Sequence, residues 1–125
     1  MHGAFDLKFG TEHRPLTDQK FAKLHEAYKH LKVLIIDEIS FIGADMLYQI
    51  HLRLCELKEK REDEEPFGGI SVILVGDLMQ LAPVNGKYVF DEPRNPKFRP
   101  FYSVNSLWHS FQPMILTHNH RQGTE

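Results

Sequence analysis

Four consecutive aliphatic residues followed directly by two carboxylates constrain the fold of this chain more than any other feature. The run Val33-Leu34-Ile35-Ile36 is apolar at every position, and Asp37-Glu38 follows it at once. A strand that is apolar on both faces is typical of the centre of a parallel sheet, because helices cover both sides of such a sheet. Open α/β folds bind their ligands at the carboxyl ends of these strands. The two acids are therefore expected at a ligand-binding edge.

The adjacent acids allow two interpretations. Neighbouring carboxylates disfavour each other's ionised form, so a functional site would use them to hold a cation or to move a proton. In a Walker B strand, one acid binds the metal of Mg-ATP and the other acts on the attacking water. In the alternative interpretation the strand is structural, and its end carries two solvated acids that lead into a loop. The residues from Val33 to Ser40 alone leave both open.

A second apolar run indicates that this strand has a parallel neighbour. Residues 70–75 form another candidate buried strand, which ends at Gly76-Asp77. The first strand is preceded by a predicted helix over about residues 16–31, for which Thr17 or Asp18 is the candidate cap. A second helix, over about residues 43–60, separates the two strands. A strand, a long crossover helix and a strand make the βαβ pattern of a parallel α/β sheet.

Each predicted helix has an apolar stripe at spacings of three and four residues. In the first helix the stripe consists of Phe21, Leu24, Tyr28 and Leu31. In the second it consists of Met46, Leu47, Ile50, Leu54 and Leu57. The single cysteine, Cys55, lies on the apolar side of the second helix, where packing is its expected role. The charged run over residues 59–65 is interpreted as a solvated helix end and a surface loop.

The last forty residues begin as a loop and end in a further candidate strand. Prolines, cations and aromatic residues alternate over residues 85–103. Such a mixture either stacks against a nucleic-acid strand or places aromatic residues beneath a surface loop. A short helix is predicted over residues 106–111, and a third buried strand over residues 114–117. Arg121 and Gln122 follow that strand.

Three predicted strands therefore end in polar groups that a parallel sheet would bring to one edge. The groups are Asp37, Glu38, Asp77, Gln80 and Arg121. Phosphoryl transfer to water requires a metal clamp, a positioned water and cationic stabilisation of the phosphate, and this set offers candidates for all three. However, the sequence contains no G-x-x-x-x-G-K-[ST], the loop whose backbone cradles the phosphates.

Composition limits the remaining classes of function. The chain has 125 residues and a formal net charge of -2, with a pI near 6.4. It therefore lacks the overall basic charge of a free-standing DNA-binding module, although a motor could still hold DNA in a local channel. No apolar stretch reaches the roughly 20 residues of a membrane span. His118 and His120 share a strand face, but the spacing of a zinc site is absent.

Two of these motifs resemble those of a known family. Leu34-Ile35-Ile36-Asp37-Glu38-Ile39-Ser40 and the run from Gly76-Asp77-Leu78-Met79-Gln80 to Leu81-Ala82-Pro83-Val84 resemble motifs II and III of the PIF-like DNA helicases. These are superfamily 1 motors related to RecD. His2-Gly3-Ala4-Phe5 resembles their motif Ia, and residues 116–122 resemble motif IV. The likeness covers almost the whole chain in the expected order, and motifs II and III together are its specific part.

The resemblance implies an ATP-dependent helicase that moves 5′ to 3′ on single-stranded DNA and unwinds duplex junctions. The fold would be a RecA-like P-loop NTPase core, a mostly parallel sheet in a three-layer α/β/α arrangement. Residues 1–125 would form part of the first motor domain, truncated before motif I and after motif IV. The phosphate loop and the second motor domain would be needed to complete the site. The protein is expected to be intracellular, in the nucleus or mitochondrion if its source is eukaryotic, with roles such as DNA repair, recombination or telomere maintenance.

The resemblance also implies residue roles. Asp37 would hold Mg²⁺, largely through water, and Glu38 would be the general base. Gln80 would sense the γ-phosphate of ATP, and Arg121 would neutralise charge on it. The side chains expected against the DNA strand are those of His2, Ala4 and Phe5.

Two substitutions depart from the family pattern. Ala82 stands where a first proline is usual, and His120 precedes Arg121 where an aromatic residue such as phenylalanine is common. An alternative function is that of a catalytically inactive remnant, an α/β module that binds DNA or a protein partner. A third possibility is another P-loop ATPase, such as a clamp-loader-like protein. A Gly-rich loop ending in Lys-Ser or Lys-Thr, encoded upstream of Met1, would favour the helicase.

Overall fold

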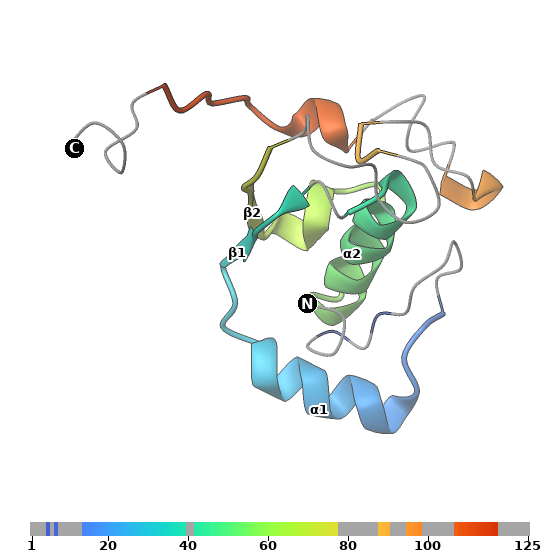
Figure 1. Ribbon diagram of the computed structural model, residues 1–125. Coiled ribbons are helices and arrows are strands. Elements are labelled where there is room, and N and C mark those ends of the chain that lie inside the picture. Colours follow the sequence, from blue (N-terminus) through green and yellow to red (C-terminus); the bar gives the residue numbers. More distant parts are fainter. Residues whose placement is uncertain are drawn as a thin grey trace.

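The described part of the chain forms a two-stranded parallel sheet with two α-helices, as a computed structural model shows (Figure 1). The structure describes residues 5, 7, 14–39, 42–77, 88–90, 95–98 and 107–117. The order of the main elements is α1 (Asp18–Tyr28), β1 (Val33–Ile36), α2 (Ala44–Leu57) and β2 (Ser71–Leu74). Short 3-10 turns lie at Pro66–Gly69, Pro96–Phe98 and Trp108–Ser110. Both predicted helices and the first two predicted strands are thereby confirmed.

The two helices differ in how their first turns are capped. Thr17 has an extended backbone, and its hydroxyl accepts a hydrogen bond from the Lys20 N–H at 3.4 Å, so it is the N-cap that the sequence suggested. Gly43 precedes α2 with an extended backbone and offers no side-chain cap. Lys58, the last capping position of α2, donates its backbone N–H to the carbonyl of Leu54 at 2.9 Å.

The sheet is parallel, and its register pairs aliphatic residues at three of its four positions. Ile36 pairs with Leu74, and Val33 pairs with Ser71. One face of the sheet, formed by Leu34, Ile36, Val72 and Leu74, packs into a hydrophobic core together with α2. Every residue of α2 except Glu56 is buried. The core thus forms between this face of the sheet and the crossover helix.

The opposite face of the sheet differs from the expectation. Val33, Ile35, Ile73 and Val75 are 50%, 62%, 49% and 42% exposed, so the strands are not buried on both sides among the described residues. The reason is topological. A parallel crossover places its helix on one face of the sheet, and α1 packs against α2 on that same side (Figure 1). The second helical layer of a three-layer fold is not present in the described part.

The predicted third strand is wrong as well. Residues 114–117 are described, yet they form no strand, and the side chains of Met114, Ile115 and Leu116 are at least 85% exposed. An apolar run becomes a strand only when it has a partner for its backbone, and no described segment pairs with this one. None of the described helices is both long and apolar enough to cross a membrane.

Candidate functional site

The two acids at the end of β1 form an exposed turn, here called the acid turn (Asp37–Glu38). Both residues are exposed. The Glu38 N–H donates to Oδ1 of Asp37 at 2.8 Å, which ties the two residues together. Glu38 has a φ of 55°, in the left-handed region that residues with a Cβ rarely adopt. The acid turn is therefore a bend that projects both carboxylates outward at the carboxyl end of the strand.

The neighbouring strand holds both ends of this turn. The Val75 N–H donates to the carbonyl of Ile36 at 2.8 Å, and the carbonyl of Val75 accepts from the Ile39 N–H at 3.0 Å. One residue at the end of β2 thus bonds to the residue before the acid turn and to the residue after it. Unpaired backbone groups are costly where water is excluded, and these two bonds restrict where the acids can lie.

Asp77 lies at the same edge of the sheet. It follows Gly76, three residues after the end of β2, and is exposed. Because the strands are parallel and in register, Asp37, Glu38 and Asp77 all emerge from carboxyl ends of adjacent strands. Two of the three predicted strand ends are therefore brought together. The remaining predicted groups, Gln80 and Arg121, lie outside the described residues, as do His118 and His120.

Of the three residues expected on the DNA strand, the structure describes only Phe5. His2 and Ala4 lie outside the described residues. Phe5 is described, and its side chain is only 3% exposed. Its ring centroid lies 4.8 Å from that of Tyr28, so the ring packs against α1 in the core. In this structure Phe5 is not presented to DNA, because its apolar ring is more stable in the core than in water.

The donor set of the acid turn fits a hard cation. Carboxylate oxygens suit Mg²⁺, which commonly takes one or two protein carboxylates and completes its shell with water and phosphate oxygens. Asp37 and Glu38 are both exposed, so water and a phosphate could share such an ion. Within the described ranges, no group of three or more His, Cys, Asp or Glu side chains could hold a metal alone. Water, together with phosphate oxygens where a nucleotide is bound, would complete the coordination.

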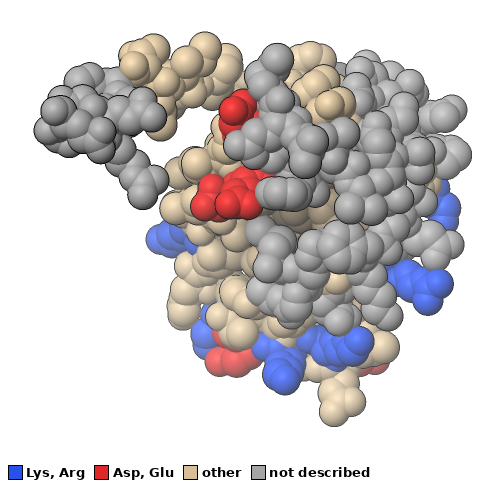
Figure 2. Space-filling model, viewed as in Figure 1, with Lys and Arg blue, Asp and Glu red and all other residues tan. Residues whose placement is uncertain are grey.

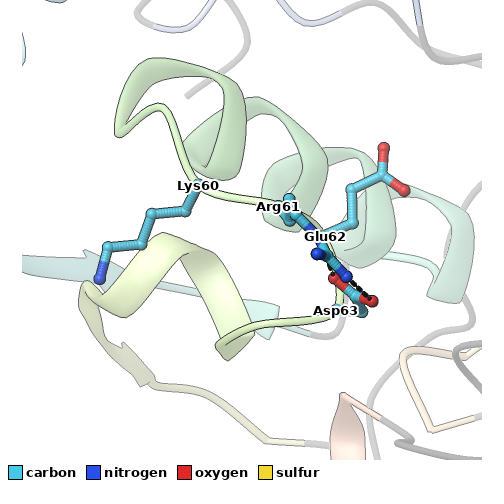
Figure 3. Close-up of a pocket in the computed structure, with 4 residues that line it drawn as sticks. All are labelled: Lys60, Arg61, Glu62 and Asp63. Atoms are coloured by element: carbon cyan, nitrogen blue, oxygen red, sulfur yellow. Dashed lines mark hydrogen bonds and ion pairs between the residues drawn. The ribbon is translucent and has the colours of Figure 1, made fainter.

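A shallow hollow elsewhere on the surface does not supply the phosphate site. It is lined by Lys60, Arg61, Glu62 and Asp63, in the loop after α2 (Figure 3). Arg61 makes a two-pronged ion pair with Asp63, Nη2 to Oδ2 at 2.7 Å and Nε to Oδ1 at 3.1 Å. Lys60 Nζ lies 3.1 Å from Oε1 of Glu65. Both cations are thus engaged by acids of their own loop.

The described charges are mixed over much of the surface. Figure 2 shows Lys and Arg side chains along the lower edge of the molecule, with acidic side chains among them, and two further groups of acidic side chains higher on that face. Lys20, Lys23 and Lys29 are exposed on α1 or at its end. No ion pair between described residues involves Asp37 or Glu38. The acid turn therefore keeps its negative field, which favours a cation.

Sequence reasoning missed the two residues that shape the acid turn. The sequence predicted Val75 only as part of a buried strand, and it identified Gly76 only as the small residue at which that strand ends. The available signal was the glycine directly before an acid at a strand end, since glycine marks positions where backbones approach closely. The pairing of Val75 with Ile36 and Ile39 has no signal in the local sequence.

Comparison with known proteins identifies relatives of the whole chain. The family described as PIF1-like helicase matches residues 1–125. The ATP-dependent DNA helicase Pif1 of Psychrobacter sp. is 38% identical over 99 residues, which cover 79% of this chain and 14% of that protein. The ATP-dependent DNA helicase RRM3 of Saccharomyces cerevisiae is 44% identical over 75 residues, covering 58% of this chain and 9% of the relative. The chain thus spans a small part of these relatives.

Solved structures give the same relationship at the level of the fold. Pif1 helicase from Bacteroides in complex with ADP-AlF3 and ssDNA aligns with a TM-score of 0.55 at 31% identity, over 71% of this chain and 24% of that one. The Bacteroides Pif1 complex with ADP-AlF4 aligns with a TM-score of 0.55 at 32% identity. The alignment covers 83% of this chain and 22% of that one. The described part is accordingly a portion of a RecA-like α/β domain, as the motifs predicted.

Proposed function

Because the chain belongs to the PIF1-like helicase family, we propose that it is part of the first motor domain of an ATP-dependent DNA helicase. The observation that supports this most is the acid turn. It stands at the carboxyl end of a parallel strand, exposed and tied to the strand that leads into Asp77. In such a motor, ATP hydrolysis would drive 5′ to 3′ movement on single-stranded DNA and the opening of duplex junctions.

The proposed chemistry divides the work between the two acids. Asp37 would hold Mg²⁺, largely through water, and Mg²⁺ when bound would neutralise charge on the phosphates of ATP. Glu38 would accept a proton from the attacking water as general base. Gln80 would sense the γ-phosphate, and Arg121 would neutralise its charge. Residues 2–5 would lie near the DNA strand, with His2 and Ala4 as contacts.

The partners follow from the same comparison. Similar solved structures include Bacteroides Pif1 bound to ssDNA and a structure that addresses DNA unwinding at forked dsDNA by two coordinating Pif1 helicases. We therefore assign single-stranded DNA and duplex junctions to this chain as proposed partners. The phosphate loop and second motor domain would complete the site, and the proposed location is intracellular.

The 125-residue chain by itself should hydrolyse little or no ATP. Its sequence contains no G-x-x-x-x-G-K-[ST], and without that cradle the phosphates lack their main backbone donors. The measurement is phosphate release with Mg²⁺, ATP and single-stranded DNA. Robust turnover that disappears in Glu38→Gln would contradict this prediction.

A segment exchange tests the proposed function directly. The part of Bacteroides Pif1 that aligns with this chain would be replaced by residues 1–125, and DNA-stimulated ATP hydrolysis would be measured. We expect a working ATPase in which Glu38→Gln lowers kcat about 10²- to 10⁴-fold, since a general base contributes about that much. A chimera that folds, binds ATP and fails to hydrolyse it would overturn the proposal.

A second candidate is a non-enzymatic α/β module that binds DNA or a protein. The acidic balance of the chain, with a formal net charge of -2, favours it. Under this candidate, the inert chimera would be accompanied by DNA or protein binding that does not depend on Asp37 or Glu38.

A further inference from the structure

Gly76 follows β2 and packs closely on the acid turn. A Cβ atom at this position would lie 2.8 Å from the backbone nitrogen of Ile39, 3.2 Å from its Cγ1 and 3.3 Å from Cα of Glu38. Backbone atoms cannot move aside as the end of a flexible side chain can. Gly76 also has a φ of 152°, which L side chains rarely adopt. Both observations require glycine here.

The conformation of Glu38 depends on this contact. Its φ of 55° is unfavourable for a residue with a Cβ, and such backbone persists only where the surroundings hold it. The surroundings are the two backbone bonds of Val75, to Ile36 and Ile39, and the close packing of Gly76. The neighbouring chain segment, together with the Glu38 N–H bond to Oδ1 of Asp37, therefore holds the acid turn in this conformation.

We propose that Gly76 is a positioning residue for Asp37 and Glu38. Its missing side chain lets the end of β2 pack directly on the acid turn, and a methyl group at this position displaces Ile39 and rotates Glu38 away from its outward position. This inference rests on the proposed function, because it assigns Gly76 to the placement of a metal-binding acid and a general base. Gly76 itself touches neither ATP nor metal.

Gly68 provides a matched control. It has a φ of 63°, and its Cβ would meet the carbonyl oxygen of Leu54 at 2.8 Å. Gly68→Ala and Gly76→Ala therefore create equally close backbone contacts and both force an L residue into unfavourable backbone. They differ in place, because Gly68 packs on α2 whereas Gly76 packs on the acid turn. If both variants lose metal affinity, the cause is lower stability of the fold. If only Gly76→Ala loses metal affinity, the cause is displacement of the acid turn.

The test compares the two variants in the 125-residue chain. Far-UV circular dichroism and thermal unfolding report folding, amide NMR shifts report the turn, and broadening by Mn²⁺ reports metal binding. For Gly76→Ala we expect shifted Glu38 and Ile39 amides and Mn²⁺ affinity weakened about 10- to 100-fold, as for other residues that orient metal ligands. Gly68→Ala should leave both readouts unchanged. Unchanged amides and Mn²⁺ affinity in folded Gly76→Ala would overturn the proposal.

Hydrogen exchange keeps the proposal testable if Gly76→Ala does not fold. In the unmodified chain, the Ile39 and Val75 amides should be protected to a similar degree, since both close the turn. An Ile39 amide that exchanges freely while Val75 is protected would overturn the inference.

The chimera separates this inference from the proposed function. There, Gly76→Ala should lower kcat at least tenfold with little change in KM for ATP, and Gly68→Ala should not. An inert parent chimera counts against the proposed function, whereas the Mn²⁺ and NMR readouts need no turnover. Full kcat in the Gly76→Ala chimera counts against the positioning role alone.

Discussion

The two helices of the described chain are buried to very different degrees. All residues of α2 except Glu56 are buried, whereas α1 has no buried residue. Hydrophobic side chains on α1, including Phe21, Leu24 and Tyr28, are only partly buried against the core. The difference follows from topology, because α2 is the crossover between the strands and α1 covers it from one side (Figure 1).

The attachments of α1 come mainly from side chains of α2 and its end. Glu56 accepts the Leu16 N–H at 2.8 Å, and Arg53 donates to the carbonyl of Arg14 at 3.0 Å. Arg53 and Glu56 are themselves joined by an ion pair of 2.7 Å. Lys58 donates to the carbonyls of Tyr28 and Lys29. Thus α2 organises the core, and α1 is held largely at its ends.

A pair of leucine truncations should give the largest effect and test this contrast directly. Leu47 of α2 is 0% exposed, and Leu24 of α1 is half-buried. Leu47→Ala should lower the free energy of unfolding by about 2–5 kcal/mol, because it removes packing and leaves a cavity. Leu24→Ala should cost about 1 kcal/mol, because less apolar surface is lost from the core. Urea unfolding measures both, and equal losses would contradict the contrast.

His51 gives α2 a pH dependence. Its Nδ1 accepts the Phe67 N–H at 2.8 Å, so the ring proton lies on Nε2, which faces the carbonyl of Glu62 at 3.1 Å. Burial lowers the pKa of His51 from 6.5 to about 4, although the hydrogen bond to Glu62 opposes this. Protonation of Nδ1 would turn this acceptor into a donor, so that its N–H would face the N–H of Phe67. Cys55 Sγ also lies 3.7 Å from Nδ1.

Acid destabilises the fold through His51, because the unfolded chain, in which the pKa of His51 is near 6.5, takes up the proton at a higher pH than the folded chain. Stability from this residue is complete above pH 6.5 and falls as the pH drops toward 4, by up to about 3 kcal/mol. The measurement is the free energy of unfolding from pH 7 to 4 for the natural chain and for His51→Gln. Subtracting the two curves removes the carboxylates they share. Parallel curves would show that His51 does not titrate as described.

The different burial of the two helices could be predicted only in part from the sequence. Local periodicity placed the helices at residues 16–31 and 43–60, and the structure has them at Asp18–Tyr28 and Ala44–Leu57. The same periodicity predicted one buried stripe on α2, but His51 and Arg53 are buried too. Their partners, Glu62 and Arg14, lie 11 and 39 residues away. Local spacing contains no information about such contacts.

The candidate site shows the same division. An apolar run ending in acids was enough to place Asp37 and Glu38 at a strand end. The shape of the turn was not predictable, because it depends on Val75 and Gly76 of the neighbouring strand. The third strand was predicted from apolarity alone at residues 114–117, and it failed because a strand also needs a hydrogen-bonding partner.

Lys58 should give the smallest effect and shows how α1 is held. Its Nζ donates to the carbonyls of Tyr28 and Lys29 at 3.3 and 3.1 Å, at the C-terminal end of α1, where a positive charge is favourable. Lys58→Met keeps most of the aliphatic stem and removes the charge, so the free energy of unfolding should fall by about 1 kcal/mol. Amide hydrogen exchange should quicken mainly in the last turn of α1.

Lys29→Met is the matched control for this substitution. Its Nζ forms an exposed ion pair with Glu26 at 2.9 Å, and exposed pairs contribute about 0–1 kcal/mol. The Lys29 carbonyl, which accepts from Lys58, stays in place. If α1 is anchored at its ends, Lys58→Met should increase exchange at the end of α1 and leave α2 protected, while Lys29→Met changes neither. Equal exchange in the two variants would mean that α1 is held by its partly buried face instead.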